Sequence, residues 1–216
     1  MLKIAGRKIG FTNRGIWKKY GVHEPIWGFV TDETLIFSRK NKASVPLHGL
    51  AHPRIEPEIC FKLASAPPRT SDPGQLLGAI EWVAHSIEIV QCQNADWKVT
   101  LADCAAQNAL HGRLIVGTPI KVSGRLDQAL PKVAVILRKS GKEIDRGTGA
   151  NVLDSPLLAL AHLIEVLARQ PGAPPLAAGE IVSTGTMTDA HPVAPGETWT
   201  TELAGLPLEG LEIHFS

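Results

Sequence analysis

Two carboxylates stand two residues apart in an extended, otherwise apolar stretch, Pro53-Arg54-Ile55-Glu56-Pro57-Glu58-Ile59-Cys60-Phe61-Lys62. In a strand, side chains at positions i and i+2 point to the same face, so Glu56 and Glu58 should stand side by side. Close carboxylates repel each other, and burying either charge without a partner is costly. A hard divalent cation would remove both costs, because it takes oxygen ligands and carries the opposite charge. The alternative is a solvated strand face, where most glutamates lie.

A third carboxylate would be needed to hold such an ion firmly. Glu88 is the best candidate, because it is the single acid in the apolar run Ser86-Ile87-Glu88-Ile89-Val90-Gln91-Cys92. It could face solvent on a half-exposed strand, or face a polar site. Three carboxylates on Mg²⁺ or Mn²⁺ would leave about three of six octahedral positions, and a 2-oxo acid can chelate two of them. The ion would then act as a Lewis acid and stabilise the enolate formed when a proton or CO₂ is lost beside the carbonyl.

The elements that must position these acids are mostly strands. The clearest helix is predicted for Pro156–Ala168, where Asp154 or Ser155 can cap the N-terminus. A second helix is expected from Gln75 to about Ala84, and Asn41 to Pro53 is expected to be a connection. Strands are predicted at 2–12, 25–37, 53–62, 85–91, 114–122, 132–138, 143–148, 180–186, 197–203 and 211–215. Many short strands with one long helix predict an α+β fold built on a strongly bent sheet, which the family resemblance given below implies to be mixed.

The composition narrows the class of protein. The chain has 216 residues with 22 Lys+Arg against 21 Asp+Glu, which argues against a nucleic-acid partner or a basic membrane-binding face. Three cysteines without metal-type spacing predict reduced thiols in a cytoplasmic protein. We find no apolar run long enough for a bilayer and no signal-peptide pattern. With no composition shift to mark a boundary, residues 1–216 are expected to form a single catalytic domain.

Several motifs, in order and at similar spacing, resemble one known family. Gly6-Arg7-Lys8-Ile9-Gly10-Phe11-Thr12-Asn13 is similar to the family's Gly-Tyr-Lys-Ile-Gly-Leu-Thr-Ser. Further matches lie at 21–29, 52–61, 87–90, 96–98, 147–156 and 180–197. The chain resembles the 2-keto-4-pentenoate hydratase and 4-oxalocrotonate decarboxylase family of the fumarylacetoacetate hydrolase superfamily. The resemblance implies a β-roll or barrel-like domain of the superfamily's C-terminal type, with few helices. It also implies Mg²⁺ or Mn²⁺, a small 2-oxo acid substrate, a role in aromatic compound catabolism and a homo-oligomer.

The resemblance also assigns roles to individual residues. Glu56, Glu58 and Glu88 match the family's metal ligands. Lys8 matches its active-site lysine, which would stabilise enolate or carboxylate charge or move a proton. The hydroxyl of Thr186 would bind the substrate carboxylate, although a turn at a strand end is the structural alternative. The remaining substrate-binding candidates are Lys98, which could equally be a surface lysine; His111, which could equally be structural; and Gly149, which would shape a turn near the site.

Three departures from the family pattern bear on activity. The family's hydratases have Pro-Asp-Phe-Gly where this chain has Pro25-Ile26-Trp27-Gly28, whereas the decarboxylases have Pro-Ile-Tyr-Gly. Ile26 cannot replace that aspartate as an acid or base for adding water. Leu110 stands where the family has a serine that can bind substrate, and the neighbouring His111 could supply a polar group instead. The family's helical lead-in is expected to be absent from this domain.

These observations favour a metal-dependent lyase that acts on small 2-oxo acids through a metal-bound enolate or dienol. The family name favours a hydratase, whereas Ile26 favours a 4-oxalocrotonate decarboxylase-like carboxy-lyase. A third hypothesis is an acylpyruvate C–C hydrolase, which would need a water-activating His/Glu pair that the sequence does not reveal. The fourth is a non-catalytic 2-oxo acid binding protein, to which the Ile26 and Leu110 departures give some weight.

Overall fold

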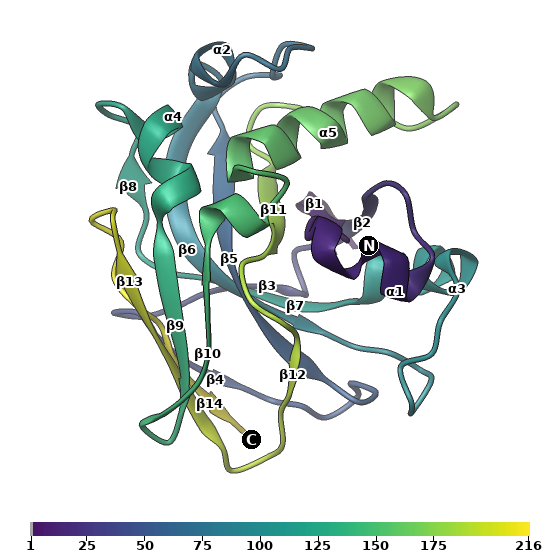
Figure 1. Ribbon diagram of the computed structural model, residues 1–216, viewed down its shortest axis with the longest axis vertical. Helices are drawn as coiled ribbons and strands as arrows, with labels where there is room; N and C mark the ends of the chain where they lie inside the picture. The colour runs from purple at the N-terminus through teal and green to yellow at the C-terminus, as the bar shows by residue number, and fades with distance from the viewer. Residues whose placement is uncertain (1) are drawn as a thin grey trace.

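Two β-sheets and one long helix make up the protein in a computed structural model that describes residues 2–216 (Figure 1). The first sheet contains β1 (Ile4–Gly10), β2 (Ile26–Thr31), β3 (Leu35–Phe37), β5 (Arg54–Leu63), β6 (Ile80–Val90), β7 (His111–Val116), β8 (Ile120–Lys121), β11 (Ile181–Thr186) and β12 (His191–Pro192). The second contains β4 (Lys42–Val45), β9 (Ala134–Lys139), β10 (Lys142–Thr148), β13 (Thr198–Ala204) and β14 (Glu212–Phe215). The helices are α1 (Trp17–Tyr20), α2 (Pro73–Leu77), α3 (Leu101–Ala106), α4 (Leu126–Ala129) and α5 (Pro156–Arg169), with 3₁₀ turns at Arg14–Ile16, Asn108–Leu110, Leu130–Lys132 and Gly149–Asn151.

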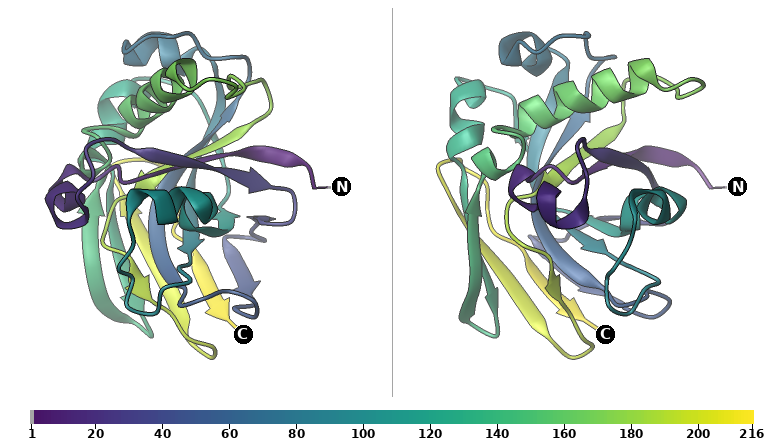
Figure 2. Two further views of the ribbon diagram at one scale, coloured as in Figure 1. Left: turned by 90° about the vertical axis from the view of Figure 1, so that its right-hand side faces the viewer. Right: turned by 45° about the vertical axis from the view of Figure 1, so that its right-hand side comes forward.

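The strand order places distant parts of the chain side by side. The first sheet runs β2-β1-β11-β5-β6-β7-β3, with β12 paired to β5 and β8 to β6, and the second runs β10-β9-β13-β14-β4. Parallel and antiparallel pairs occur in both sheets. Figure 2 shows the sheets facing each other below α5, with the first sheet strongly curled. The predicted α+β fold with a mixed, bent sheet and few helices is therefore confirmed.

The β5–β6 hairpin is the longest pairing and carries the site. On β5 the odd-numbered side chains enter the core: Ile59 and Phe61 pack against the region under α5, while Ile55 packs between the two sheets. The even-numbered side chains therefore point to the opposite face, which includes Arg54, Glu56 and Glu58. Glu56 and Glu58 therefore share one face of β5, as their spacing in the sequence predicts.

Helix α5 begins as the sequence predicts. The side-chain oxygen of Ser155 accepts a hydrogen bond from the Leu157 backbone N–H, and Pro156 occupies the first turn. Leu160, Leu163 and other apolar residues on one side of the helix are buried against the first sheet. By length and composition alone, residues 149–169 could cross a membrane, which the sequence analysis did not expect. In this fold 56% of the most apolar window of that segment is buried, as in the core helix of a soluble protein.

Two predicted elements differ from the structure. The helix expected from Gln75 to Ala84 is wrong, because α2 ends at Leu77 and the chain has entered β6 by Ile80. Asp72 caps the N-terminus of this short helix. The residues after it instead form β6, which pairs with nearly the whole of β5, and this pairing outweighs their helical pattern of apolar residues. The connection expected between Asn41 and Pro53 contains β4, which pairs in parallel with β14 at the C-terminus.

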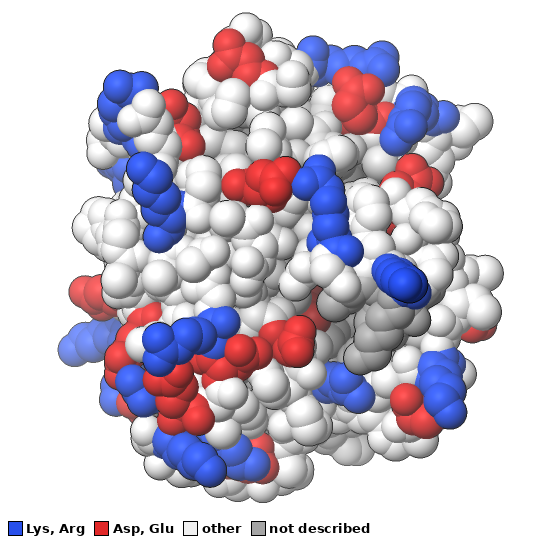
Figure 3. All heavy atoms as spheres, viewed as in Figure 1, with Lys and Arg blue, Asp and Glu red and all other residues white. Residues whose placement is uncertain are grey.

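Charged side chains of both signs are interspersed over the face shown in Figure 3. Across β9, β10 and β13, Arg138 pairs with Glu202 and Arg146 pairs with Glu143. This mixing agrees with the near-zero net charge of the chain.

Candidate metal centre and active site

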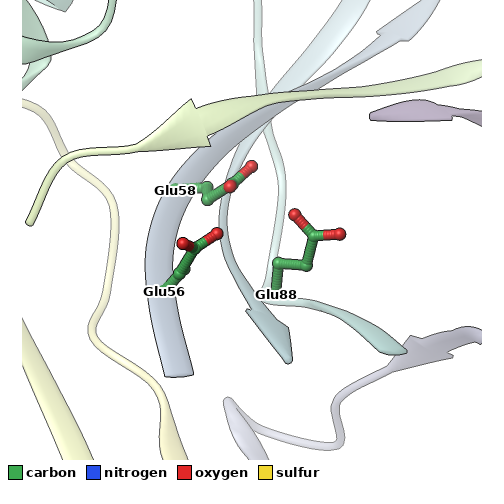
Figure 4. Close-up of side chains that lie close together, drawn as sticks. All are labelled: Glu56, Glu58 and Glu88. Carbon is green, nitrogen blue, oxygen red and sulfur yellow. The ribbon is translucent and has the colours of Figure 1, made fainter. Parts of the chain in front are cut away.

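Three glutamates converge from two neighbouring strands. Glu56 and Glu58 come from β5, and Glu88 on β6 lies directly opposite Glu56 in the antiparallel register. One carboxylate oxygen of each lies within 4.8 Å of the others, and Figure 4 shows the three side chains close together, extending from the two strands into the same region. Glu58 and Glu88 are fully buried, whereas Glu56 is half-buried. The structure thus brings together all three residues that the sequence analysis selected as metal ligands.

The two carboxylate oxygens of Glu58 differ in their hydrogen bonding. Its Oε2 accepts hydrogen bonds from the Ser183 hydroxyl and, at 3.0 Å, from the Gly185 backbone N–H. Its Oε1 is buried and has no hydrogen-bond partner within residues 2–216. Burial, followed by the charges of Glu88 and Glu56, raises the pKa of Glu58 well above its ordinary value. An oxygen of this kind needs a proton or a cation.

Glu88 is held by two basic side chains. The Nδ1 atom of His111 lies 2.7 Å from Glu88 Oε1, and the Nζ atom of Lys8 lies 3.1 Å from Oε2. Burial alone would raise the pKa of Glu88, but Lys8 and His111 together hold it below its ordinary value. The buried carboxylate therefore stays ionised and fixed in orientation.

Lys8 is a buried cation at the same place. It comes from β1, which joins the sheet through parallel pairing with β11, and its Nζ donates to the Ala109 carbonyl at 3.0 Å. Burial alone would lower the pKa of Lys8, but the charges of the three glutamates raise it above its ordinary value. A lysine in this setting stays protonated.

The balance of charge favours a cation. Burial is the largest cause that raises the pKa of Glu56 to about 7, with Lys8 opposing the shift and Glu88 adding to it. Three carboxylates thus share one lysine, and a buried oxygen of Glu58 remains unpartnered. Oxygen-only donors of this charge fit a hard divalent ion, and the residues present therefore fit the metal that the sequence predicted.

A cavity of about 170 Å³ adjoins the centre. Lys8, Glu56 and Thr186 line it, together with Thr12, whose buried hydroxyl has no hydrogen-bond partner in the described part of the chain. Apolar lining comes from several separate segments and includes Ile26, Val90, Trp97 and Leu110. A small molecule with one polar end and an apolar body fits such a lining.

The other predicted substrate-binding residues lie in different settings. Thr186 lines the cavity, but its hydroxyl donates to the Thr188 carbonyl at 3.0 Å, so it also closes the turn that was the structural alternative. His111 is not part of the cavity lining. Its ring bridges Glu88 and the Thr34 hydroxyl, which lies 2.9 Å from Nε2, so it supports a metal ligand rather than the substrate.

The structure places two of the predicted positions, Lys98 and Gly149, away from the cavity. The side chain of Lys98 is 87% exposed, pairs with Asp96 and does not line the cavity, because it follows a loop into solvent. Gly149 lies outside the cavity and allows close backbone packing: a Cβ atom there would meet the Leu130 carbonyl oxygen at 1.9 Å. Neither residue is placed to bind a substrate in the cavity.

The sequence analysis missed several contributors. Ser183 and Gly185 hold Glu58 through strand β11, and no sequence pattern links them to β5. His85 lies in β6, and its Nδ1 is 2.9 Å from the Glu58 carbonyl oxygen. A single histidine in an apolar strand was a signal of the same kind as Glu88, and it could have been noticed.

Comparisons with known proteins identify the family. No family model matches the sequence. A curated 4-oxalocrotonate decarboxylase of Pseudomonas sp. strain CF600 is 34% identical over 208 residues, which cover 94% of this chain and 75% of the relative. The chain belongs to the 2-keto-4-pentenoate hydratase and 4-oxalocrotonate decarboxylase family. A 2-keto-4-pentenoate hydratase of Paraburkholderia xenovorans strain LB400 is similarly close, with 33% identity over 210 residues, covering 94% of this chain and 74% of the relative. The resemblance noted from the motifs is therefore confirmed, and the family's named members are enzymes.

Solved structures agree with this family. The 4-oxalocrotonate decarboxylase from Pseudomonas putida G7, complexed with magnesium and adipate, matches with a TM-score of 0.87 and 30% identity over 100% of this chain and 79% of that one. A fumarylpyruvate hydrolase from Pseudomonas aeruginosa, in complex with Mn²⁺ and pyruvate, has a TM-score of 0.70 at 14% identity, covering 97% of this chain and 88% of that one. The second likeness shows that the two proteins share a fold.

Proposed function

We propose that this protein is a divalent-metal-dependent lyase that acts on a small 2-oxo acid, most simply as a hydratase of the 2-keto-4-pentenoate type. The observation that carries the proposal is the convergence of Glu56, Glu58 and Glu88 beside Lys8 at a cavity. The names of the relatives support the reaction class, and the magnesium complex of a structural relative supports the kind of ion.

Glu56, Glu58 and Glu88 would hold the ion, with Mg²⁺ or Mn²⁺ as the candidates. Bound there, the ion would supply positive charge to the carboxylate and carbonyl oxygens of a 2-oxo acid. Two of the three ligands have distinct supports: Ser183 and Gly185 orient Glu58, and His111 orients Glu88. Such supports keep carboxylates in a fixed geometry, so little reorganisation is needed when a ligand arrives.

Lys8 would act on the substrate directly. An ammonium group has three N–H donors; in Lys8 the Ala109 carbonyl accepts from one of them, and Glu88 Oε2 lies 3.1 Å away as an ion-pair partner. Because Lys8 also lines the cavity, a remaining donor can bind an oxygen on which negative charge develops.

The apolar lining would exclude water from the hydrocarbon part of the substrate. Val90, Leu110 and Ile26 line the cavity on the same side of the fold as the charged centre. A lower local dielectric strengthens the interaction between Lys8 and a substrate anion. The cavity thus combines a charged centre, where the chemistry would occur, with apolar lining for the hydrocarbon part of the substrate.

Decarboxylation is the second candidate, and Ile26 favours it. The motif of the family's hydratases has an aspartate at the position of Ile26. In this protein the aliphatic side chain of Ile26 lines the cavity there. A carboxy-lyase reaction needs no acid or base at this point to add water. The carboxylate centre and Lys8 would serve either reaction, because both stabilise negative charge next to a carbonyl.

Turnover assays separate these functions. The Mg²⁺-loaded protein would be incubated with 2-hydroxypenta-2,4-dienoate and with 2-oxohex-3-enedioate, following dienol absorbance and CO₂ release. A hydratase removes the first absorbance without releasing CO₂, whereas a decarboxylase releases CO₂ from the second compound. Lys8→Gln should abolish turnover, and the exposed Lys98→Gln should leave it unchanged as a matched control. No turnover of either compound by protein with bound metal would refute the lyase proposal and leave a binding protein.

We also propose that the protein works as a cytoplasmic homo-oligomer in which these residues form one catalytic domain. Cys60, Cys92 and Cys104 are buried and free, which suits a reducing compartment. Sedimentation equilibrium of the metal-loaded protein measures the assembly, and a monomer at micromolar concentration would refute that part of the proposal.

A further inference from the structure

Arg54 lies beside the carboxylate centre and belongs to the same cavity. It occupies the same face of β5 as Glu56, two residues earlier, and both side chains line the cavity. Its guanidinium carbon lies 4.0 Å from the centroid of the Trp97 ring. The indole N–H of Trp97 in turn donates to the His52 carbonyl at 3.1 Å, so the ring is anchored by the chain that leads into β5.

The charge of Arg54 has no ionic partner in the structure. Within residues 2–216 its guanidinium makes no hydrogen bond and no ion pair, whereas Arg69 and Arg138 are each paired with a glutamate. Stacking on an indole face holds a guanidinium in place but leaves its N–H groups free at the edge. The one other acid in the cavity lining besides Glu56 is the exposed Asp189, and it forms no ion pair with Arg54.

This arrangement is suited to one kind of ligand group. The planar, fork-shaped donors of arginine match a carboxylate in a two-point interaction. Two residues along a strand span about 6.6 Å, which is on the order of the length of a short dicarboxylic acid. Val90, opposite Arg54 in the strand register, and Leu110 add apolar lining suited to the hydrocarbon between two charged ends.

We propose that Arg54, held by Trp97, binds a second carboxylate at the far end of the substrate and so selects 2-oxo diacids over 2-oxo monoacids. The inference rests on the proposed function, since it takes the 2-oxo acid end to lie at the Glu56 and Lys8 centre. It names Arg54 as the residue that sets substrate charge. A preference for diacids favours the decarboxylase-like reaction over the hydratase-like one, because 2-oxohex-3-enedioate carries two carboxylates and 2-hydroxypenta-2,4-dienoate carries one.

A simpler role for Arg54 must be separated from this one. Arg54 also opposes the charge of Glu56, and it could serve the metal ligand alone. Support for Glu56 would strengthen the binding of every 2-oxo acid equally. Recognition of a second carboxylate would strengthen only the binding of diacids. The difference between two ligands of equal length is therefore the informative quantity.

The experiment measures binding of 2-oxoadipate and 2-oxohexanoate to the Mg²⁺-loaded protein by calorimetry. These probes have six carbons each and differ in the far carboxylate. We expect wild type to prefer the diacid by at least about tenfold, because a charge-assisted pair is worth about that factor. Arg54→Gln should lose this preference while its affinity for 2-oxohexanoate stays within about twofold. Arg54→Lys should retain part of it, and Arg125→Gln, which alters an exposed arginine without an ion pair, should retain all of it.

The binding results either support or overturn the proposed role of Arg54. Equal weakening of both probes in Arg54→Gln, or no preference in wild type, would overturn it even if the protein is an active lyase. Arg54-dependent preference for the diacid supports it even if neither compound in the turnover assays reacts, in which case the lyase proposal alone fails. Unchanged Mg²⁺ stoichiometry in Arg54→Gln shows that the variant is folded around the site.

Discussion

His85 should make the metal-free protein sensitive to acid, and the structure gives the size of the effect. The ring lies fully buried between the two sheets, with Nδ1 at 2.9 Å from the Glu58 carbonyl oxygen and Nε2 at 2.8 Å from the Thr201 hydroxyl. The Leu211 backbone N–H donates to that hydroxyl at 2.8 Å. The hydroxyl's other acceptor, the Leu211 carbonyl, lies farther away than Nε2, at 3.5 Å, so the hydroxyl donates to Nε2. The neutral ring with its proton on Nδ1 therefore satisfies every partner.

Protonation of His85 is disfavoured in the folded state. Burial lowers its pKa to about 4, against an ordinary value of 6.5, with the bond to Glu58 opposing the shift. Below pH 6.5 the unfolded chain binds a proton that the folded chain refuses, so the stability contributed by this residue falls as pH drops from 6.5 towards 4. At about 1.4 kcal/mol per pH unit, the loss between pH 6.5 and pH 5.0 is about 2 kcal/mol.

Urea unfolding of wild type and His85→Asn, both in the presence of a chelator, measures this loss. The asparagine amide can still donate to the Glu58 carbonyl but does not titrate, and the other titrating groups are common to both proteins. The stability advantage of wild type should be constant above pH 7 and should shrink by about 2 kcal/mol between pH 6.5 and pH 5.0. An advantage that does not change with pH would refute the assignment of a buried, neutral His85.

Three further predictions follow from the same geometry. Because Glu56 has a pKa of about 7 and must lose its proton to bind a cation, Mg²⁺ affinity should rise at least about tenfold from pH 6 to pH 8 in calorimetry, and a flat profile would contradict this. His111→Asn should weaken Mn²⁺ binding about 10–100-fold, because a ligand loses its supporting donor; unchanged affinity would show that the His111 contact is dispensable. Gly149→Ala should cost about 3 kcal/mol in urea unfolding and leave KM unchanged, whereas a raised KM without lost stability would restore its predicted substrate-binding role.

Only part of the metal centre could be predicted from the residue pattern alone. The spacing of Glu56 and Glu58 predicted two carboxylates on one strand face, because side-chain alternation is a local property. The position of Glu88 opposite Glu56 depends on the register between two strands, which sequence spacing does not fix. Glu88 was selected as the single acid of an apolar run, and the family resemblance supported that choice; only the structure places it opposite Glu56.

The other differences between the sequence analysis and the structure also arise from contacts between distant parts of the chain. The helix expected beyond Gln75 gave way to β6, because a long-range pairing with β5 decides the conformation there. Lys98 and Gly149 matched motif positions, but motif matching carries no information on side-chain direction or on backbone contact with Leu130. Arg54 was overlooked beside the glutamates, because its significance depends on Trp97 from a separate loop and on the absence of an ion pair within residues 2–216.

Binding of Mn²⁺ to wild type and to Glu58→Gln, followed by electron paramagnetic resonance, tests the metal centre most directly. Glu58→Gln keeps the shape of the side chain and removes the charge of the ligand whose Oε1 lacks a partner. Wild type and Glu33→Gln, which changes an exposed acid, should each bind one ion per chain, and Glu58→Gln should bind none at the same concentration. Equally tight binding by Glu58→Gln would contradict a centre built from these three carboxylates.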